Sequence, residues 1–249
     1  MSGHSKWAQI KRKKAVVDAK RGAHFTRLIR EITVAARQGG GDPDGNPRLR
    51  SAIQTAKAAN MPNENIDRAI KKGTGELAGV SYEEVTYEGY GPGGAAIIVE
   101  VTTDNLNRTV AEVRHVFSRR GSNLGAPNSV AWMFEKKGQM VADADRYDED
   151  TCMEAALEAG AEDFAVEGDQ YVVRTDPARV HSVAQKMVAA GIEVSHVELA
   201  MIPNSTVSVE GEEAQQLLDM IDALDELDDV SHVFSNFEID SETLAELSN

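Results

Sequence analysis

The sequence has little of what extracellular and membrane proteins depend on. Its 249 residues include one cysteine, Cys152, which excludes a disulfide framework and a multi-cysteine zinc site and is typical of a reducing compartment. It has no run of about 20 apolar residues, and no apolar segment follows the basic N-terminus. We therefore expect neither a membrane span nor a signal peptide, and we predict a location in the cytoplasm.

Motifs for enzymatic chemistry are also missing. The six histidines show neither the H-x-x-H nor the H-E-x-x-H spacing of metal ligands, and the acidic runs at 143–150 and 219–229 lack the calcium-loop pattern. Cys152 begins a predicted helix and is more simply interpreted as a small buried hydrophobic residue than as a nucleophile. We predict that the protein is not an enzyme and uses no cofactor and no metal.

One glycine pattern is compatible with two structures. Gly89, Gly91 and Gly94 satisfy the formula G-x-G-x-x-G of dinucleotide sites. Such a site needs a helix directly after the loop, whereas the residues that follow here, A-A-I-I-V at 95–99, are typical of a strand. The kinase motifs that accompany a glycine loop within a hairpin are absent. The pattern therefore predicts a wide hairpin turn.

What the chain does have is a segregated charge. Its 26 Lys and Arg against 41 Asp and Glu give a net charge of −15, which taken alone argues against nucleic acid as a partner. Residues 1–80, however, hold 16 basic and 7 acidic residues, a net charge of +9, and residues 81–249 hold 10 and 34, a net charge of −24. We call residues 1–80 the basic head and residues 81–249 the acidic body. The positive charge of the head is suited to binding a polyanion.

The positive charge is densest at the N-terminus, where residues 1–30 contain nine basic residues and one acid, Asp18. We predict that a basic arm over residues 1–22 and the helix after it contact phosphates, and that Trp7 stacks on a base. Two alternatives remain, namely a solvated charged tail and a Trp7 that only packs the arm against the helical domain. The predicted contact residues are Lys6, Trp7, Lys11, Arg12, Lys13, Lys14, Lys20, Arg21, Arg27 and Arg30.

Residues 23–79 have the pattern of a small helical domain. Apolar residues at helical spacing predict a first helix from Ala23 to the glycines at 39–41. Asn46 before Pro47 predicts the cap and start of a second helix. A third helix is predicted from residue 62 to Gly73, with Gly73 as the glycine just past its end. Residues 73–79 then form a linker.

From residue 80 onward the apolar pattern is that of strands alternating with helices. The tetrapeptide V-S-H-V follows a predicted helix at 194–197 and again at 230–233, which favours two copies of an α+β unit, although four residues can also match by accident. Two ferredoxin-like α+β domains fit this order. Strands are predicted at 84–88, 95–102, 130–134, 139–142, 164–166, 171–174, 193–201, 206–209 and 231–238, and helices at 108–119, 153–158, 177–190 and 212–224.

Longer motifs resemble those of the YebC/PmpR family, from about residue 2 to residue 240. Ser122 and Asn128 stand where relatives often have glycine, and both lie in predicted turns. The motifs are G-H-S-K-W (3–7), D-A-K-R-G (18–22), G-G-G-D-P-D (39–44), N-P-R-L-R (46–50), N-M-P (60–62), Y-E-G-Y-G-P-G-G (87–94), D-N-x-N-R-T-V-A-E-V-R-H (104–115), N-L-G (123–125) and M-E-A-A-L-E-A-G-A-E-D (153–163).

The resemblance implies an α+β fold with an N-terminal three-helix domain and two ferredoxin-like α+β domains, one inserted in the other. The outer domain would comprise residues 80–133 and 205–249, and the inserted domain residues 134–204. It also implies a role in gene expression. Bacterial members are described as probable transcriptional regulators that bind promoter DNA, a mitochondrial relative activates translation, and bacterial members have been tied to ribosomes stalled on proline runs.

Two functional hypotheses follow. The first is a DNA-binding transcriptional regulator, and the alternative is a ribosome-associated translation factor that binds ribosomal RNA and relieves stalling. Contacts to the phosphate backbone would dominate both, so the charge pattern does not separate them. No helix-turn-helix recognition helix with base-reading side chains is evident, which favours recognition of shape or of RNA.

Overall fold

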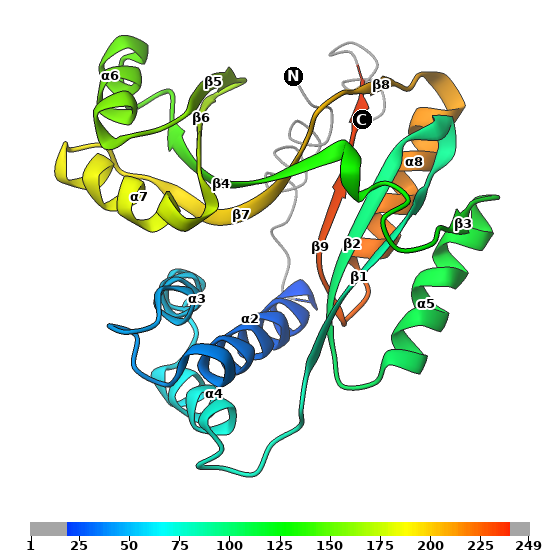
Figure 1. Ribbon diagram of the computed structural model, residues 1–249, viewed down its shortest axis with the longest axis horizontal. Helices are drawn as coiled ribbons and strands as arrows, with labels where there is room; N and C mark the ends of the chain where they lie inside the picture. Colours follow the sequence, from blue (N-terminus) through cyan, green and yellow to red (C-terminus); the bar gives the residue numbers. More distant parts are fainter. Residues whose placement is uncertain (1–18, 240–249) are drawn as a thin grey trace.

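The computed structural model describes residues 19–239, which form three parts visible in Figure 1. A helical part comes first in the chain, and two antiparallel sheets with their own helices follow. The class is mixed α+β, as the sequence predicts.

The helical part consists of α2 (Ala19–Gly39), α3 (Pro47–Ala58) and α4 (Asn63–Thr74). Its core brings together apolar side chains from all three helices, among them Ile32, Leu49 and Ile66. The predicted cap of α3 is present, because the Asn46 side chain accepts a hydrogen bond of 3.1 Å from the backbone N–H of Leu49. Helix α2 begins at Ala19, four residues before the predicted start.

Helix α4 ends differently from the prediction. It continues through Thr74, and Gly75, with a φ of 84°, is the left-handed residue at its end. Gly73 lies inside the helix, where a Cβ atom would be 2.4 Å from the carbonyl oxygen of Thr33 and 2.7 Å from the Cβ of Ala36. Gly73 is therefore needed for the close approach of α4 to α2, and the prediction that it closes the helix was wrong.

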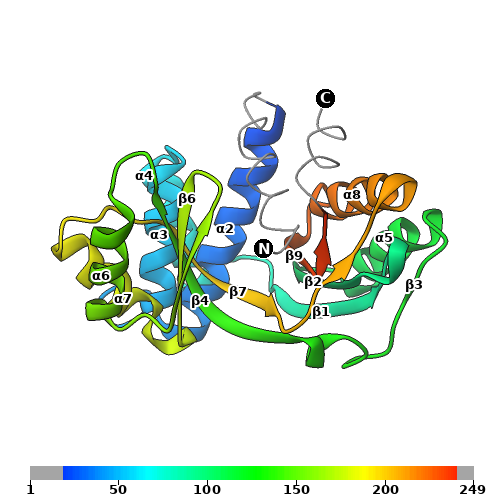
Figure 2. The same cartoon turned by 90° about the horizontal axis from the view of Figure 1, so that it is seen from above.

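The first sheet has the strand order β3-β1-β2-β9. Strands β1 and β2 form the hairpin predicted for the glycine loop, and the turn contains the short helix η1. Figure 2 shows α5 and α8 on one side of this sheet and α2 on the other. The bounds are β1 (Glu83–Tyr90), η1 (Pro92–Gly94), β2 (Ala96–Thr103), α5 (Leu106–Arg119), β3 (Asn123–Leu124), α8 (Gly211–Asp225) and β9 (Val230–Ser235).

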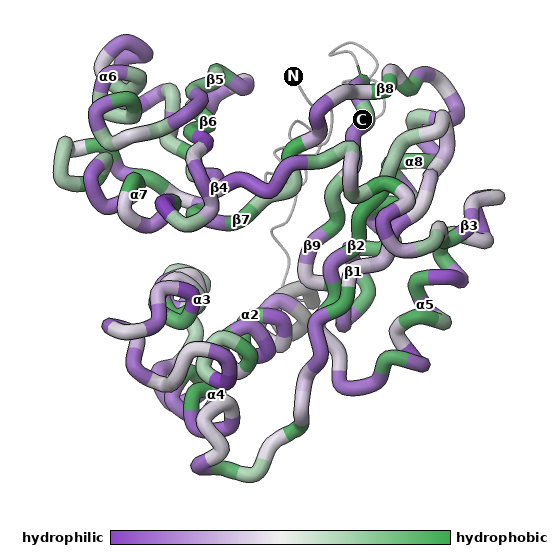
Figure 3. The backbone as a smooth tube through the Cα atoms, viewed as in Figure 1, coloured by the Kyte–Doolittle hydropathy of each residue, from purple (hydrophilic) through white to green (hydrophobic). Residues whose placement is uncertain are grey.

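Two short strands, β8 (Val207–Ser208) and β10 (Phe237–Glu238), pair in parallel as a separate small sheet. The core of this region packs apolar residues of β2 and β9 against those of α5 and α8, including Ile97, Phe117 and Leu217. In Figure 3 the hydrophobic colour is most continuous along β2, which is buried over almost its whole length. Within residues 19–239, none of the helices combines the length and the hydropathy that crossing a bilayer requires.

The second sheet has the order β5-β6-β4-β7 and is antiparallel throughout. Its elements follow the β-α-β-β-α-β order of ferredoxin-like domains, and all of them lie between β3 and β8 in the chain. Strands β7 and β9, where the two V-S-H-V segments lie, are each an edge strand that follows a helix. The bounds are β4 (Phe134–Asp143), α6 (Glu149–Ala159), β5 (Asp163–Glu167), β6 (Gln170–Thr175), η3 (Pro177–Arg179), α7 (Val180–Ala189) and β7 (Ser195–Pro203).

The strand predicted at 130–134 is not formed. The segment contains the short helix η2 (Ala131–Met133), and β4 begins only at Phe134. The reason is the buried carboxylate of Glu88, which accepts hydrogen bonds of 2.8 to 2.9 Å from the backbone N–H groups of Asn128, Val130 and Ala131. These donors are thus taken by a side chain instead of a neighbouring strand.

Candidate nucleic-acid interface

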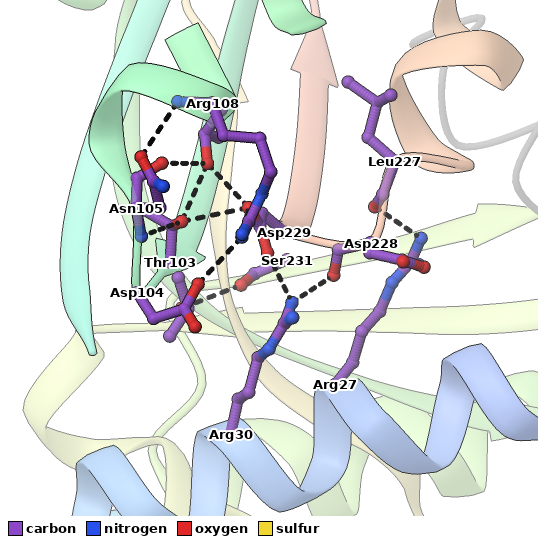
Figure 4. Close-up of polar contacts among 12 residues, drawn as sticks. Arg27, Arg30, Thr103, Asp104, Asn105, Arg108, Leu227, Asp228, Asp229 and Ser231 are labelled. Atoms are coloured by element: carbon purple, nitrogen blue, oxygen red, sulfur yellow. Dashed lines mark hydrogen bonds and ion pairs between the residues drawn. The ribbon is translucent and has the colours of Figure 1, made fainter. Parts of the chain in front are cut away.

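The predicted contact residues fall into three groups. Six of them, Lys6, Trp7, Lys11, Arg12, Lys13 and Lys14, lie outside the described residues. Lys20 and Arg21 belong to the first turns of α2. Arg27 and Arg30, further along the same helix, contact the loop that joins α8 to β9 (Figure 4).

Arg27 and Arg30 connect the helical part to the first sheet. The guanidinium of Arg27 donates to the backbone carbonyls of Asp225 and, at 3.3 Å, Leu227, at the end of α8. Arg30 donates to the carbonyl of Asp228 and lies 2.9 Å from the carboxylate of Asp229. Carbonyls at a helix C-terminus carry partial negative charge and attract cations. Both arginines therefore hold the helical part against the first sheet. The neighbouring residues in the sequence did not indicate this role.

Asp229 is the centre of this contact. Its side chain is 1% exposed, and its Oδ2 lies 2.6 Å from Arg108, 2.6 Å from the Thr109 hydroxyl and 2.9 Å from the Thr103 hydroxyl. Burial by itself raises the pKa of a carboxyl group, but the hydrogen bonds from Thr109, Arg108 and Thr103 and the charge of Arg30 outweigh it, so the pKa of Asp229 is below its ordinary value. Asp229 is held as a carboxylate that joins α2, β2, α5 and β9.

The start of α5 places Arg108 and Thr109 for this role. Asn105 caps the helix by accepting a hydrogen bond of 3.1 Å from the backbone N–H of Arg108. The Arg108 guanidinium also lies 2.8 Å from the carboxylate of Asp104, one helical turn before it. The segment 104–109, which belongs to one of the motifs noted in the sequence, therefore forms a polar framework around the carboxylate of Asp229.

A cavity of about 510 Å³ lies beside this contact. Carboxylates outnumber guanidinium groups along its wall by five to two, so its field repels phosphates. A nucleic-acid backbone would therefore approach the basic head elsewhere. The lining residues are Arg30, Asp104, Arg108, Glu112, Glu226, Leu227, Asp228 and Asp229.

A second contact joins the helical part to β1. Arg48 of α3 donates to Glu31 of α2 at 2.7 Å and also pairs with Glu84 of β1. Gln38 supports it by donating to Glu84 at 2.8 Å. Partial burial alone would lower the pKa of Arg48, but its hydrogen bonds to Glu31 and Glu84 raise it, so the guanidinium stays charged. Arg48 is thus a third cation of the head that already has carboxylate partners.

Helix α4 presents cations that are not among the predicted contact residues. Arg68, Lys71 and Lys72 are spaced so that they share one side of the helix, and Arg68 and Lys71 are exposed. The helical spacing of these three cations can be recognised in the sequence. The higher density of positive charge in residues 1–30 placed the predicted contacts there instead. The first five residues of α4 carry Glu64 and Asp67 and no cation, so its N-terminal end is acidic.

The groups considered for enzymatic chemistry have ordinary surroundings. Cys152 is buried in α6, and this burial raises the pKa of its thiol, which keeps it in the less reactive protonated form. Over residues 19–239, no three His, Cys, Asp or Glu side chains come together as potential ligands of a metal ion.

Comparison with known proteins connects this architecture to a family. The model described as "TACO1/YebC protein N-terminal domain" matches residues 5–76, and the model described as "TACO1/YebC second and third domain" matches residues 82–237. A crystal structure of a conserved hypothetical protein from Aquifex aeolicus is similar, with a TM-score of 0.86 at 49% identity, covering 92% of this chain and 95% of that one.

Curated relatives match over almost their whole length. A protein of Acidithiobacillus ferrooxidans is 60% identical over 247 residues, which is 99% of this chain and 98% of the relative. A protein of Pelotomaculum thermopropionicum is 57% identical over 242 residues, 96% of this chain and 100% of the relative. Both are named probable transcriptional regulatory protein. With both domain models and these relatives in agreement, this chain belongs to the TACO1/YebC family of regulatory proteins.

Proposed function

We propose that the protein is a nucleic-acid-binding regulator of gene expression, and specifically a transcriptional regulator that binds DNA. The observation that carries the proposal is the charge segregation, +9 over residues 1–80 against −24 over residues 81–249. A polyanion is attracted to the first and repelled by the second, so it would meet the molecule at the head. The names of the relatives support a regulatory role.

In this proposal the arm supplies most of the phosphate contacts. Arg27, Arg30 and Arg48 are engaged with carboxylates or carbonyls of the first sheet or its loops. The contacts to the nucleic-acid backbone then come from Lys6, the basic run at 11–14, Lys20 and Arg21, while Trp7 stacks on a base. Arg68 and Lys71 of α4 are exposed cations of the head and add to its positive charge.

One observation favours the alternative of a translation factor that binds ribosomal RNA. A recognition helix of the helix-turn-helix type reads base edges with its N-terminal residues. The first five residues of α4 carry Glu64 and Asp67 and no cation, and these carboxylates would face the phosphates that line a major groove. Helix α4 is therefore poorly suited to reading base edges in a major groove, whereas recognition by shape is typical of structured RNA.

The salt dependence of binding tests the arm directly. Changing Lys11, Arg12, Lys13 and Lys14 together to Ala should weaken binding and reduce the slope of log K against log salt by up to about 3 to 4 units, since each phosphate contact contributes roughly 0.7 to 0.9. The measurement is fluorescence anisotropy over a range of salt concentrations. A variant with Lys11, Lys13 and Lys14 changed to Arg keeps the charge and should keep the slope. Unchanged affinity and slope in the Ala variant would remove the arm from the mechanism.

The same assay separates the two hypotheses when duplex promoter DNA and ribosomal RNA fragments compete at one salt concentration. Preference for promoter DNA over random duplexes and over RNA supports the transcriptional regulator. Preference for ribosomal RNA over both DNA ligands supports the translation factor and contradicts the DNA proposal.

A further inference from the structure

One histidine lies where the three parts of the molecule meet. His232 belongs to β9, the edge strand of the first sheet on the side of α2 and β7 (Figure 1). It pairs in register with Glu100 of β2, and its Nδ1 atom lies 3.5 Å from the Glu100 carboxylate. Its ring stacks on that of Phe234, with 5.8 Å between the centroids. The side chain is 47% exposed, so the imidazole can exchange its proton with solvent.

The face of the sheet that carries His232 is the one on which the helical part packs. Side chains alternate along a strand, and the register places Glu84, Glu100 and His232 on the same face. Arg48 of α3 reaches this face at Glu84 and also holds Glu31 of α2. The carboxylate of Glu31 is thereby brought to the same side of the sheet as the imidazole.

The second sheet touches this face through an apolar cluster. Met201 of β7 packs with Phe234 of β9 in that cluster. Glu198 lies three residues before Met201 on β7, and its negative charge acts on His232. Lys136 of β4 is the register partner of Met201, and its positive charge acts on the carboxylates of the face. The imidazole therefore has charged neighbours from all three parts of the molecule.

Carboxylates outnumber cations around the imidazole. Four carboxylates against two cations leave a charge of −2 when the imidazole is neutral, and protonation reduces this to −1. Partial burial by itself lowers the pKa of His232, but its hydrogen bond to Glu100 and the charges of Glu198 and Glu31 outweigh it, so this pKa lies above its ordinary value. The facing groups are Glu31 of α2, Arg48 of α3, Glu84 of β1, Glu100 of β2, Lys136 of β4 and Glu198 of β7.

We propose that protonated His232 is a pH-sensitive clamp that holds the helical part and the second sheet against the first sheet. When the proton leaves, the unbalanced negative charge at the junction grows, and the parts separate around the apolar cluster of Met201 and Phe234. Because the pKa is raised, the clamp is complete below the ordinary pKa of about 6.5 and is lost as the pH rises through the higher folded value. The clamp concerns the arrangement of the parts and needs no nucleic acid.

A histidine at another contact has the opposite behaviour. His181 of α7 is half-buried, and the charge of Arg50 in α3 acts on it. Burial and Arg50 both lower the pKa of His181, so it takes up a proton only below the ordinary pKa of about 6.5 and then repels the helical part. His181 therefore favours separation at low pH, whereas His232 favours it at high pH.

The distance between α3 and α6 tests the clamp. Fluorophores for energy transfer are attached at Gln54→Cys and Glu158→Cys, both exposed positions, while the buried Cys152 does not react. The mean distance should lengthen as the pH rises from about 5.5 to 8.5, with a midpoint above about 6.5. His232→Gln is neutral at every pH and should show the long distance throughout. The matched control is His115→Gln, at an exposed histidine of α5, which should keep the wild-type profile.

A second variant tests the clamp with His232 in place. Glu198→Gln removes one of the carboxylates that favour the imidazolium, so the midpoint should move to lower pH while circular dichroism shows an intact fold. A wild-type distance that does not change with pH would overturn the proposal. So would an unchanged midpoint in Glu198→Gln, or a wild-type profile in His232→Gln. Loss of the profile in His181→Gln alone would assign the transition to the contact of α7 with α3 and refute the clamp.

Discussion

At the scale of single residues, Asp229 shows how one buried carboxylate can join distant segments. It meets Thr103 and Arg108 more than a hundred residues away in the chain, and Arg30 in the helical part. Sequence reasoning could predict the Asn46 cap, because the capping side chain and the backbone N–H group that donates to it are three residues apart. It could not predict the partners of Arg27 and Arg30, because no local spacing encodes a contact across about 200 residues.

The first prediction concerns this carboxylate. Asp229→Asn keeps the size of the side chain but leaves Arg108 and Arg30 without their buried anionic partner, so the free energy of unfolding should fall by roughly 3 kcal/mol. Urea denaturation followed by circular dichroism measures the change. The control is Asp228→Asn, at the exposed neighbour whose backbone carbonyl contacts Arg30, and it should change stability by less than about 0.5 kcal/mol.

The difference in stability between wild type and Asp229→Asn should also depend on pH. The pKa of Asp229 is lower in the folded protein than in the unfolded chain, so its stabilising contribution is complete above the ordinary pKa of about 4 and is lost as the pH falls through the folded value. The gap in stability between wild type and Asp229→Asn should stay constant from pH 7 to about 5 and narrow below about 4. A gap that is independent of pH down to the acid transition would contradict the role given to the carboxylate.

At the scale of elements, the sequence predicts helices and the hairpin well, because periodicity and turn residues are local. The strand predicted at 231–238 is divided into β9 and β10, which belong to different sheets. Two further errors have tertiary causes. Gly73 fits the pattern of a helix-ending glycine, yet it is kept inside α4 by the proximity of α2. The apolar segment at 130–134 fits the pattern of a strand, yet Glu88 takes the backbone donors that a strand would need.

Gly73→Ala tests the close packing of α2 and α4. Alanine favours helix by about 1 kcal/mol over glycine, so a free helix would gain stability. Here the added Cβ would lie 2.4 Å from a backbone oxygen of α2, and we expect a net loss of roughly 1–3 kcal/mol in thermal or urea denaturation. Gly45→Ala is the control, since its Cβ would meet only the Asp42 carbonyl oxygen at 3.9 Å. A stabilised Gly73→Ala protein would show that the helices do not pack so closely.

At the scale of the whole molecule, the charge difference between head and body is the feature on which the proposed function rests. Net charge alone argued against nucleic acid, and only its distribution along the chain favours it. The structure adds that part of the head's charge, on Arg27, Arg30 and Arg48, is used to hold the helical part against the first sheet. The sequence therefore predicts the sign of the surface but overstates the number of free cations on the head.

Neutralising the body tests whether it orients the molecule. Glu210, Glu212 and Glu213 lie at the exposed start of α8. Changing all three to Gln should strengthen binding to random duplex DNA severalfold at low salt, because the repulsion between the body and phosphates is reduced, and the difference should disappear at high salt. Electrophoretic mobility shifts at two salt concentrations measure this. Unaltered non-specific binding would mean that the acidic body does not steer the head.

The most direct test of the central claim is crosslinking in living cells, followed by sequencing of both the DNA and the RNA recovered with the protein. The account predicts that nucleic acid is recovered with the wild-type chain and largely lost when Lys11, Arg12, Lys13 and Lys14 are changed to Ala. Enrichment at promoters would support the transcriptional regulator, and enrichment of ribosomal RNA without promoters would support the translation factor. Recovery of no nucleic acid above background, or equal recovery with the arm variant, would contradict the account.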